Sequence, residues 1–227
     1  MTNTGLHFVV CTRGTSSDAQ TVRSLRAHGL GENITVYENN QEGLPTCYNR
    51  VLNARQDLNE IVVFLHDDIA IWDIMLTAKL IHARGHLGYS IIGLAGAKTL
   101  DCNPNKNGIV GWDSGVGAPR SGAVEHELPN GQSFVITFGP TPAECEVIDG
   151  FFIGVDMRAI GKTRFDERFN FHFYDLDFCI AARKAGLRIG VTNIHVMHFS
   201  MGNFRSEKFH KAQIEFLSKH KQYVSRS

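Results

Sequence analysis

Short apolar runs alternate with helix-like stretches along the first half of the chain. The runs that predict strands are residues 8–11, 34–37, 61–65 and 91–95, and the stretches that predict helices are residues 19–28, 46–55 and 74–84. The strand-like runs are apolar throughout rather than alternating with polar residues, which is typical of a parallel sheet covered by helices on both faces. The pattern therefore predicts an α/β fold with a doubly wound, mostly parallel sheet.

The regular alternation stops over residues 98–142, which are rich in Gly, Pro, Asn and Ser. Long loops inside a compact domain are usually functional. Residues 122–126 and 133–138 flank Pro129-Asn130-Gly131, and Asn-Gly is a strong hairpin signal. We therefore expect a small antiparallel flap of two strands within this segment.

Ordered elements return in the last third of the chain. Regular structure is expected again from residues 145–155, and a helix that continues through Ala185 is ended by Gly186. A last strand is expected over residues 188–192, and residues 206–223 have the spacing of an amphipathic helix. Because no repeat or linker interrupts the chain, we expect one domain over residues 1–227.

Composition and charge remove several classes of function. The 227 residues contain 23 Lys plus Arg and 23 Asp plus Glu, so the chain has no net charge that would attract nucleic acid. We therefore expect no nucleic-acid partner. The apolar run at residues 8–11 is too short for a signal segment or a membrane span, which predicts a cytoplasmic protein. Five cysteines without a C-x-x-C pair argue against a disulfide framework or a structural zinc site.

His66-Asp67-Asp68 directly follows the apolar run at residues 61–65. Open α/β sheets bind their ligands at the carboxyl ends of strands, and carboxylates suit Mg²⁺ or Mn²⁺. A divalent cation that bridges a diphosphate would offset the cost of placing two carboxylates there. Solvated loop aspartates that cap the next helix explain the same residues equally well.

A second group of acidic residues lies at the start of the predicted helix that Gly186 ends. Asp175 and Asp177 are two residues apart, so on a helix they cannot share a face, and only one should point into a pocket. This spacing suits one general base beside one structural partner. Two first-turn aspartates that stabilise the helix dipole are an equally good interpretation.

A single histidine, His198, follows the last predicted strand, 21 residues after Asp177. A lone histidine in such a place is more often a hydrogen-bonded core residue than a metal ligand. His198 is therefore a candidate metal ligand only in combination with the two groups of acidic residues described above.

Seven short motifs occur in a fixed order along the chain. They are Val36-Tyr-Glu38-Asn39, Gly43-Leu-Pro-Thr-Cys-Tyr-Asn49, His66-Asp-Asp68, Gly150-Phe-Phe152, Phe165-Asp-Glu-Arg-Phe169, Tyr174-Asp-Leu-Asp177 and Val196-Met-His198. From residue 8 to about residue 198, the chain resembles the family 2 type of glycosyltransferases with the GT-A fold. It departs from the family pattern at Glu38, where Asp is usual, at His66, which replaces the first acid of D-x-D, and at Tyr174, which replaces the Glu of an E-D pair.

The resemblance implies a nucleotide-binding half over residues 1–97, an acceptor and catalytic half over residues 98–205, and a C-terminal helix over residues 206–227. It implies Mn²⁺ or Mg²⁺ held by Asp68 and His198, and a nucleoside-diphosphate sugar as the donor, with a UDP-sugar favoured. The residues that it implies for donor binding are Thr12, Arg13, Glu38, Asn39, Asn49 and Asp67.

The resemblance also implies an acceptor that is a glycan or a lipid-linked glycan. The general base is expected to be Asp175, with Asp177 as the fallback, and a single base predicts inversion at the anomeric carbon. The candidate acceptor-binding residues are Trp112, Asp113, His126 and Phe151, although core positions suit the aromatic ones at least as well.

Other classes of function fit the chain less well. A non-catalytic nucleotide-sugar or glycan-binding module would not need Asp68, Asp175 and His198. A nucleotidyltransferase would want a richer phosphate loop than residues 11–14, and no H-x-H or H-E-x-x-H motif supports a metal-dependent hydrolase. The basic residues of the C-terminal helix allow peripheral membrane contact, but a solvated face is the favoured interpretation; they are Lys208, Lys211, Lys219, Lys221 and Arg226.

Overall fold

The apolar runs of the sequence form the central sheet of the protein. The computed structural model describes residues 5–102, 109–112, 119–128, 130–200, 202 and 204–223. The seven-stranded sheet has the order β2 (Ile34–Tyr37), β1 (Leu6–Cys11), β3 (Ile61–Leu65), β11 (Phe152–Asp156), β5 (Ile91–Gly93), β12 (Ile189–Val191) and β9 (Ala143–Glu144). β1 pairs in parallel with β2 and β3, and β5 with β12, whereas β11 and β9 pair antiparallel with their neighbours. The predicted α/β fold with a mostly parallel sheet is confirmed.

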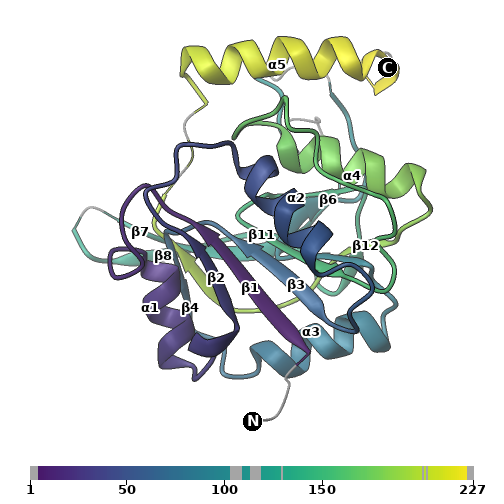
Figure 1. Ribbon diagram of the computed structural model, residues 1–227. Coiled ribbons are helices and arrows are strands. Elements are labelled where there is room, and N and C mark those ends of the chain that lie inside the picture. Colours follow the sequence, from purple (N-terminus) through teal and green to yellow (C-terminus); the bar gives the residue numbers. More distant parts are fainter. Residues whose placement is uncertain are drawn as a thin grey trace.

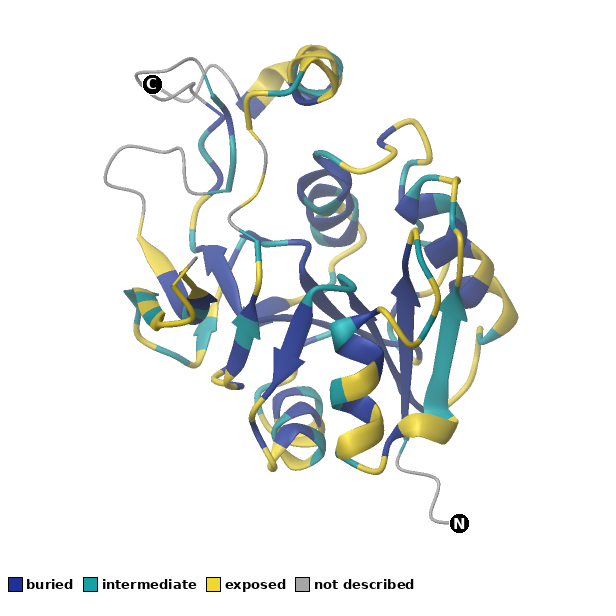
Figure 2. Ribbon diagram, turned by 90° about the vertical axis from the view of Figure 1, so that its left-hand side faces the viewer, coloured by how far each residue is buried: buried dark blue, intermediate teal, exposed yellow. Residues whose placement is uncertain are grey.

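Helices cover both faces of this sheet (Figure 1). They are α1 (Gln20–Ala27), α2 (Leu44–Ala54), α3 (Leu76–Gly85) and α4 (Tyr174–Lys184). Val9 and Phe64 belong to one buried cluster together with residues of α2 and α4, and Val10 and Val63 belong to a second cluster with residues of α1 and α3. Successive strand residues thus enter opposite cores, which explains why the runs are apolar throughout. Figure 2 shows these strands as buried and the outward helix turns as exposed.

A second sheet lies beside the first and contains the predicted flap. Its strands are β10 (Val147–Ile148), β6 (Ala95–Ala97), β7 (Arg120–Glu127), β13 (Val196–His198) and β4 (Ile69–Ile71), and β8 (Ser133–Gly139) pairs with β7. The antiparallel β7–β8 hairpin confirms the predicted flap, although Pro129 of its turn lies outside the described residues. The strand predicted over residues 91–95 is instead divided between the two sheets, because β5 pairs with β11 and β12 whereas β6 pairs with β7 and β10.

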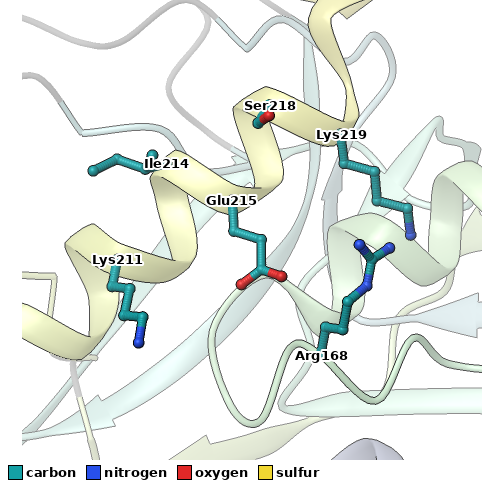
Figure 3. Close-up of a pocket in the computed structure, with 6 residues that line it drawn as sticks. All are labelled: Arg168, Lys211, Ile214, Glu215, Ser218 and Lys219. Atoms are coloured by element: carbon teal, nitrogen blue, oxygen red, sulfur yellow. The ribbon is translucent and has the colours of Figure 1, made fainter.

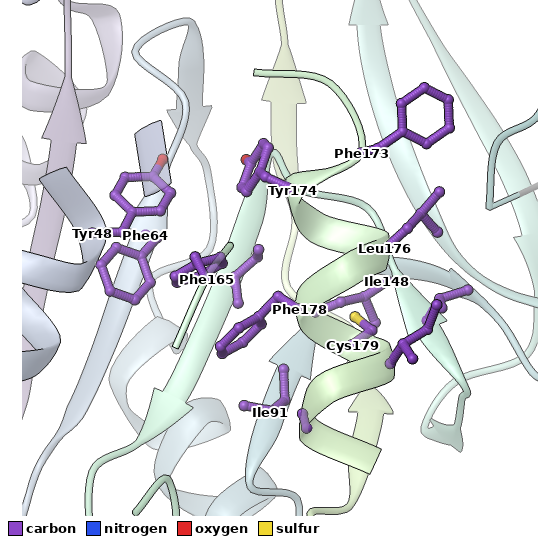
Figure 4. Packing of buried hydrophobic residues seen from close by; sticks show 14 of the residues in the cluster. Tyr48, Phe64, Ile91, Ile148, Phe165, Phe173, Tyr174, Leu176, Phe178 and Cys179 are labelled. Carbon is purple, nitrogen blue, oxygen red and sulfur yellow. The ribbon is translucent and has the colours of Figure 1, made fainter. Parts of the chain in front are cut away.

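The second half of the chain packs α4 onto the sheet (Figure 4). Phe178 of α4 stacks on Phe165 with ring centroids 3.9 Å apart, and Tyr48 of α2 lies 4.3 Å from Phe64 of β3. α4 ends before Gly186, whose φ of 79° suits a residue without a side chain. This packing fixes the first turn of α4 against the loop between β10 and β11.

The predicted amphipathic helix at the end of the chain is confirmed as α5 (Glu207–Lys219), with a short 3-10 turn (Lys221–Tyr223) after it. Ser206 caps the helix by accepting a hydrogen bond from the backbone N–H of Phe209. Phe209 and Phe216 are buried, and both rings lie close to the ring of Phe173. α5 therefore covers the end of the molecule beside α4 (Figure 1).

Candidate functional site

Strand pairing brings a carboxylate and an imidazole from distant parts of the chain together. β13 pairs antiparallel with β4, which places His198 opposite Ile69, and the backbone N–H of Phe199 donates to the carbonyl of Asp68. Nε2 of His198 lies 3.3 Å from Oδ1 of Asp68. His66 joins them, because its ring nitrogen, the carboxylate of Asp68 and the ring nitrogen of His198 all lie within 4.8 Å of one another. We call these three residues the His-Asp-His cluster.

The charges of the His-Asp-His cluster suit a cation. Burial raises the pKa of Asp68, but the imidazoles of His198 and His66 outweigh it and lower that pKa to about 2. Burial and the neighbouring His198 lower the pKa of His66, which keeps its ring neutral. Oδ1 of Asp68 is buried and makes no hydrogen bond within the described residues, although the ring nitrogen of His198 lies 3.3 Å from it. An ionised carboxylate and a neutral imidazole are the forms that bind a divalent metal.

Aromatic side chains surround the two histidines of the cluster. The ring of Phe151 stacks on His198 at a centroid distance of 5.1 Å, and the ring of Phe171 stacks on His66 at 5.6 Å. His126 also contacts His198, with its Nδ1 3.1 Å from the backbone carbonyl oxygen of that residue. Two predicted acceptor-binding residues, His126 and Phe151, are therefore buried beside the cluster and pack against His198.

A cavity of about 390 Å³ opens next to the His-Asp-His cluster. It is lined by Thr12, Gly14, Asp18, Ala19, Gln20, Arg23, Asp67, Asp68 and Phe199. Three of the residues predicted for donor and metal binding, Thr12, Asp67 and Asp68, thus share one cavity at the carboxyl ends of β1 and β3. Figure 1 shows these strand ends side by side.

The other predicted donor residues lie at the loops around this cavity or away from it. Arg13 is exposed, and the carboxylate of Glu38 accepts a hydrogen bond of 2.6 Å from the backbone N–H of Ser16. Asn39 has a φ of 49°, and its backbone N–H donates to the carbonyl of Gly14. These contacts make Glu38 and Asn39 supports of the loop that follows β1.

Asn49 has a different surrounding from the one predicted. Its amide group donates to the carbonyl of Phe165 and to the carboxylate of Glu167, and its Oδ1 accepts from the backbone N–H of Phe165. These hydrogen bonds join α2 to the turn at residues 165–169, and Asn49 does not line the cavity. The side chain is therefore used within the fold.

The carboxylate of Asp175 lies against the loop between β10 and β11. Its Oδ2 accepts a hydrogen bond of 2.9 Å from the backbone N–H of Gly150, and its Oδ1 accepts from that of Leu176. A Cβ atom at position 150 would lie 3.0 Å from Cβ of Asp175 and 2.5 Å from the hydroxyl of Tyr174, so this close approach needs glycine. Burial and then the charge of Asp149 raise the pKa of Asp175 to about 7.

Asp149 links this carboxylate to Trp112. The indole Nε1 of Trp112 donates to Oδ2 of Asp149 over 2.7 Å, and the backbone N–H of Phe151 donates to its Oδ1. Trp112, predicted to bind the acceptor, thus contacts the acidic neighbour of the predicted base. Asp113, predicted for the same role, lies outside the described residues.

Asp177 faces α5 instead. Its carboxylate is 2% exposed and accepts hydrogen bonds from Nζ of Lys219 and Nε2 of His220, 2.6 and 2.7 Å long. Asp175 and Asp177 therefore point to different partners, as their spacing on α4 requires. These hydrogen bonds of Asp177 attach the end of α5 and the residue after it to α4.

A second groove, of about 450 Å³, lies along α5 (Figure 3). It is lined by Arg168, Lys211, Ile214, Glu215, Ser218 and Lys219. Lys219 also binds the carboxylates of Asp166 and Asp177, and Arg168 binds Asp166, so most of the basic charge here is already paired. The helices of the described residues are all too short or too polar to cross a lipid bilayer.

Three residues that had no predicted role contact the candidate site in the structure. His66 is a third possible ligand, Asp149 is the acidic neighbour of Asp175, and Tyr174 contacts His66. The only signal for His66 was its place beside Asp67 and Asp68, where an acid was expected. Asp149 precedes the Gly150-Phe-Phe152 motif, but nothing in the sequence indicated that it would face α4.

A doubly wound sheet with mostly parallel strands, an acidic motif directly after β3 and an antiparallel flap are typical of the GT-A fold of glycosyltransferases. The chain belongs to a glycosyltransferase-like family, whose family model matches residues 9–220. No curated protein gave a significant match to the sequence.

Solved structures agree with this fold. GalNAc-T7, solved with UDP, GalNAc and Mn²⁺, aligns with a TM-score of 0.53 and 12% sequence identity, over 94% of this chain and 47% of that chain. This chain therefore spans about half the length of GalNAc-T7. A197 from STIV aligns with a TM-score of 0.50 and 12% identity, over 86% of this chain and 85% of that chain. At this level of identity the likeness shows the fold alone.

Proposed function

We propose that the protein is an inverting glycosyltransferase that moves a sugar from a nucleoside-diphosphate sugar to an acceptor hydroxyl, with the help of a divalent metal ion. The observation that carries this proposal is the convergence of His66, Asp68 and His198 beside the cavity that Thr12 and Asp67 line. Family membership supports the transfer of a sugar. The donor favoured is a UDP-sugar.

The metal ion would be held by Asp68, His198 and His66. When bound, it supplies positive charge that stabilises the leaving diphosphate. The buried Oδ1 of Asp68 fits this role, since it makes no hydrogen bond within the part of the chain that the structure describes. Two imidazoles and one carboxylate suit transition ions better than Mg²⁺, which prefers oxygen ligands, so we expect Mn²⁺ to bind more tightly than Mg²⁺.

The residues after β1 and β3 would bind the nucleotide of the donor. Thr12 and Asp67 line the cavity and offer a hydroxyl and a carboxylate, and Arg13 is exposed close by in sequence. Glu38 and Asn39 would act by holding the loop after β1 in shape, through their hydrogen bonds to Ser16 and Gly14. Both groups lie at the carboxyl ends of strands, where open α/β sheets bind ligands.

Asp175 would take the proton of the acceptor hydroxyl while the oxygen attacks the anomeric carbon. A single base favours direct displacement, which inverts the configuration at that carbon. Trp112 would form part of the acceptor site, since its indole is anchored to Asp149 beside the base. The acceptor class proposed is a glycan or a lipid-linked glycan, and in the second case the basic residues of α5 would contact the membrane peripherally.

The pH dependence of transfer follows from the pKa of Asp175, which is about 7. Because the base must be ionised to accept a proton, we expect kcat/KM to fall about tenfold for each pH unit below 7 and to level off above it. Asp149→Asn removes the negative neighbour, so the midpoint of the profile should move to lower pH. A midpoint that stays unchanged in this variant would contradict the role given to the Asp149 charge.

Thermal unfolding with nucleotides tests the donor and the metal together. UDP with Mn²⁺ is expected to raise the melting temperature, because a ligand that binds only the folded state stabilises it, and UDP without a metal should have a much smaller effect. GDP, dTDP and CMP serve as comparisons for the base. Stabilisation by UDP and Mn²⁺ without transfer to any acceptor would favour a binding module, and no stabilisation by any nucleotide would contradict the proposal.

A further inference from the structure

The hydroxyl of Tyr174 lies between a backbone carbonyl and the His-Asp-His cluster. Tyr174 is the first residue of α4 and is 1% exposed. Its hydroxyl oxygen lies 2.8 Å from the carbonyl oxygen of Gly150 and 3.1 Å from Nε2 of His66. The glycine at position 150 is what allows α4 to approach so closely, since a Cβ there would meet this hydroxyl at 2.5 Å.

These two contacts determine the tautomer of His66. A carbonyl oxygen only accepts hydrogen bonds, so the single hydroxyl proton of Tyr174 is donated to Gly150. The hydroxyl oxygen can then only accept from His66, which requires the proton of the neutral ring to be on Nε2. Nδ1 is left with the lone pair, and it is the one ring nitrogen that can bind a cation.

The two residues that contact each other here are both departures from the family pattern. By the resemblance to family 2 glycosyltransferases, His66 stands where the first acid of D-x-D is usual, and Tyr174 stands where the Glu of the E-D pair is usual. A carboxylate at position 66 would bind a metal through either oxygen and would need no partner to choose between them. An imidazole has two unlike nitrogens and needs a partner that fixes the proton.

We propose that Tyr174 is a positioning residue of the metal centre, which fixes the proton of His66 on Nε2 and so presents Nδ1 as the third ligand. This inference rests on the proposed function, because it assumes that the cluster binds a divalent ion. If the inference holds, the metal affinity depends on the Tyr174 hydroxyl, although this hydroxyl does not itself bind the metal. The partners of ligating histidines typically account for a 10–100-fold effect on affinity.

The tautomer can be measured without any metal. In ¹⁵N-labelled wild-type protein free of metal, long-range ¹H–¹⁵N NMR correlations of the His66 ring are expected to show the proton on Nε2. A spectrum with the proton on Nδ1 would overturn the inference, whatever the protein binds. This measurement uses the unmodified chain and does not depend on how a variant folds.

The affinity can be measured by titrating Mn²⁺ into the protein in a calorimeter. Tyr174→Phe is expected to weaken Mn²⁺ binding by about 10–100-fold. Tyr89→Phe is the matched control: it removes the hydroxyl of a buried tyrosine whose ring packs against Gly190 and Arg188, and it should leave the Mn²⁺ affinity within about twofold of wild type.

The outcomes separate the inference from the proposed function. Wild-type affinity in a folded Tyr174→Phe variant overturns the role of Tyr174 and leaves the metal centre in place. Equal losses in Tyr174→Phe and Tyr89→Phe also overturn it, because the effect would then come from general packing. Failure of the wild-type protein to bind Mn²⁺ would contradict the metal of the proposed function and the inference with it.

Discussion

Asp175→Asn is expected to reduce kcat for sugar transfer by about 10²–10⁴-fold, the usual contribution of a general base. The amide keeps the shape of the carboxylate, and its oxygen can still accept from the backbone N–H of Gly150, although its NH2 group cannot replace the bond from Leu176. It cannot take the proton of the acceptor hydroxyl. Donor and Mn²⁺ binding should remain close to wild type, because the His-Asp-His cluster is unchanged. Initial rates at saturating donor, together with calorimetric titration of UDP and Mn²⁺, measure both effects.

Asp177→Asn is the matched control for this result. It makes the same chemical change two residues along α4, at a carboxylate that binds Lys219 and His220 of the C-terminal segment. This variant should keep its transfer rate below its melting temperature, although the loss of the buried ion pairs should lower that temperature. Wild-type transfer by Asp175→Asn, with loss of transfer in folded Asp177→Asn, would move the base to Asp177.

Asp68→Asn should remove metal-dependent donor binding. Asp68 is the only carboxylate of the His-Asp-His cluster, and its ionised form is the one that neutralises the cation. Loss of a residue that only hydrogen-bonds to a metal ligand typically weakens metal binding by about 10–100-fold. Loss of the ligand itself should therefore weaken Mn²⁺ binding by more than about 100-fold. UDP should then stabilise the variant equally with and without Mn²⁺. Calorimetry and thermal unfolding report these two quantities.

Asp18→Asn provides the control for a general loss of negative charge. Asp18 lines the same cavity but does not belong to the cluster, and its carboxylate is bonded to Thr15. Its Mn²⁺ affinity should therefore stay close to wild type. If Asp68→Asn binds Mn²⁺ as tightly as the wild-type protein does, the metal site lies elsewhere.

The central sheet could be predicted from the sequence because its strands are buried on both faces. Val9 and Val10 are buried in opposite cores, so both must be apolar, and the result is an uninterrupted apolar run in the sequence. The second sheet was predicted only at its hairpin. β4 and β13 are strands of three residues, too short for any periodicity, and they are defined by the partners that they meet in the fold.

The candidate site was partly predictable for a similar reason. Asp68 and Asp175 occupy the motif positions that suggested them, one after a buried strand and one at the start of a helix. His66, Asp149 and Tyr174 depend on contacts between segments far apart in the chain, such as the hydrogen bond between residues 66 and 174. No local pattern encodes such contacts. The same holds for Asn49, whose motif position did not indicate its bonds to the turn at residues 165–169.

The convergence of the His-Asp-His cluster on a single divalent ion is tested most directly by crystals grown with Mn²⁺ and UDP and measured at the manganese absorption edge. We expect one strong anomalous peak within bonding distance of Asp68, His198 and His66, with the diphosphate of UDP in contact with it. A peak bound by other residues, or a diphosphate bound in the cavity with no manganese beside these three side chains, would contradict the account.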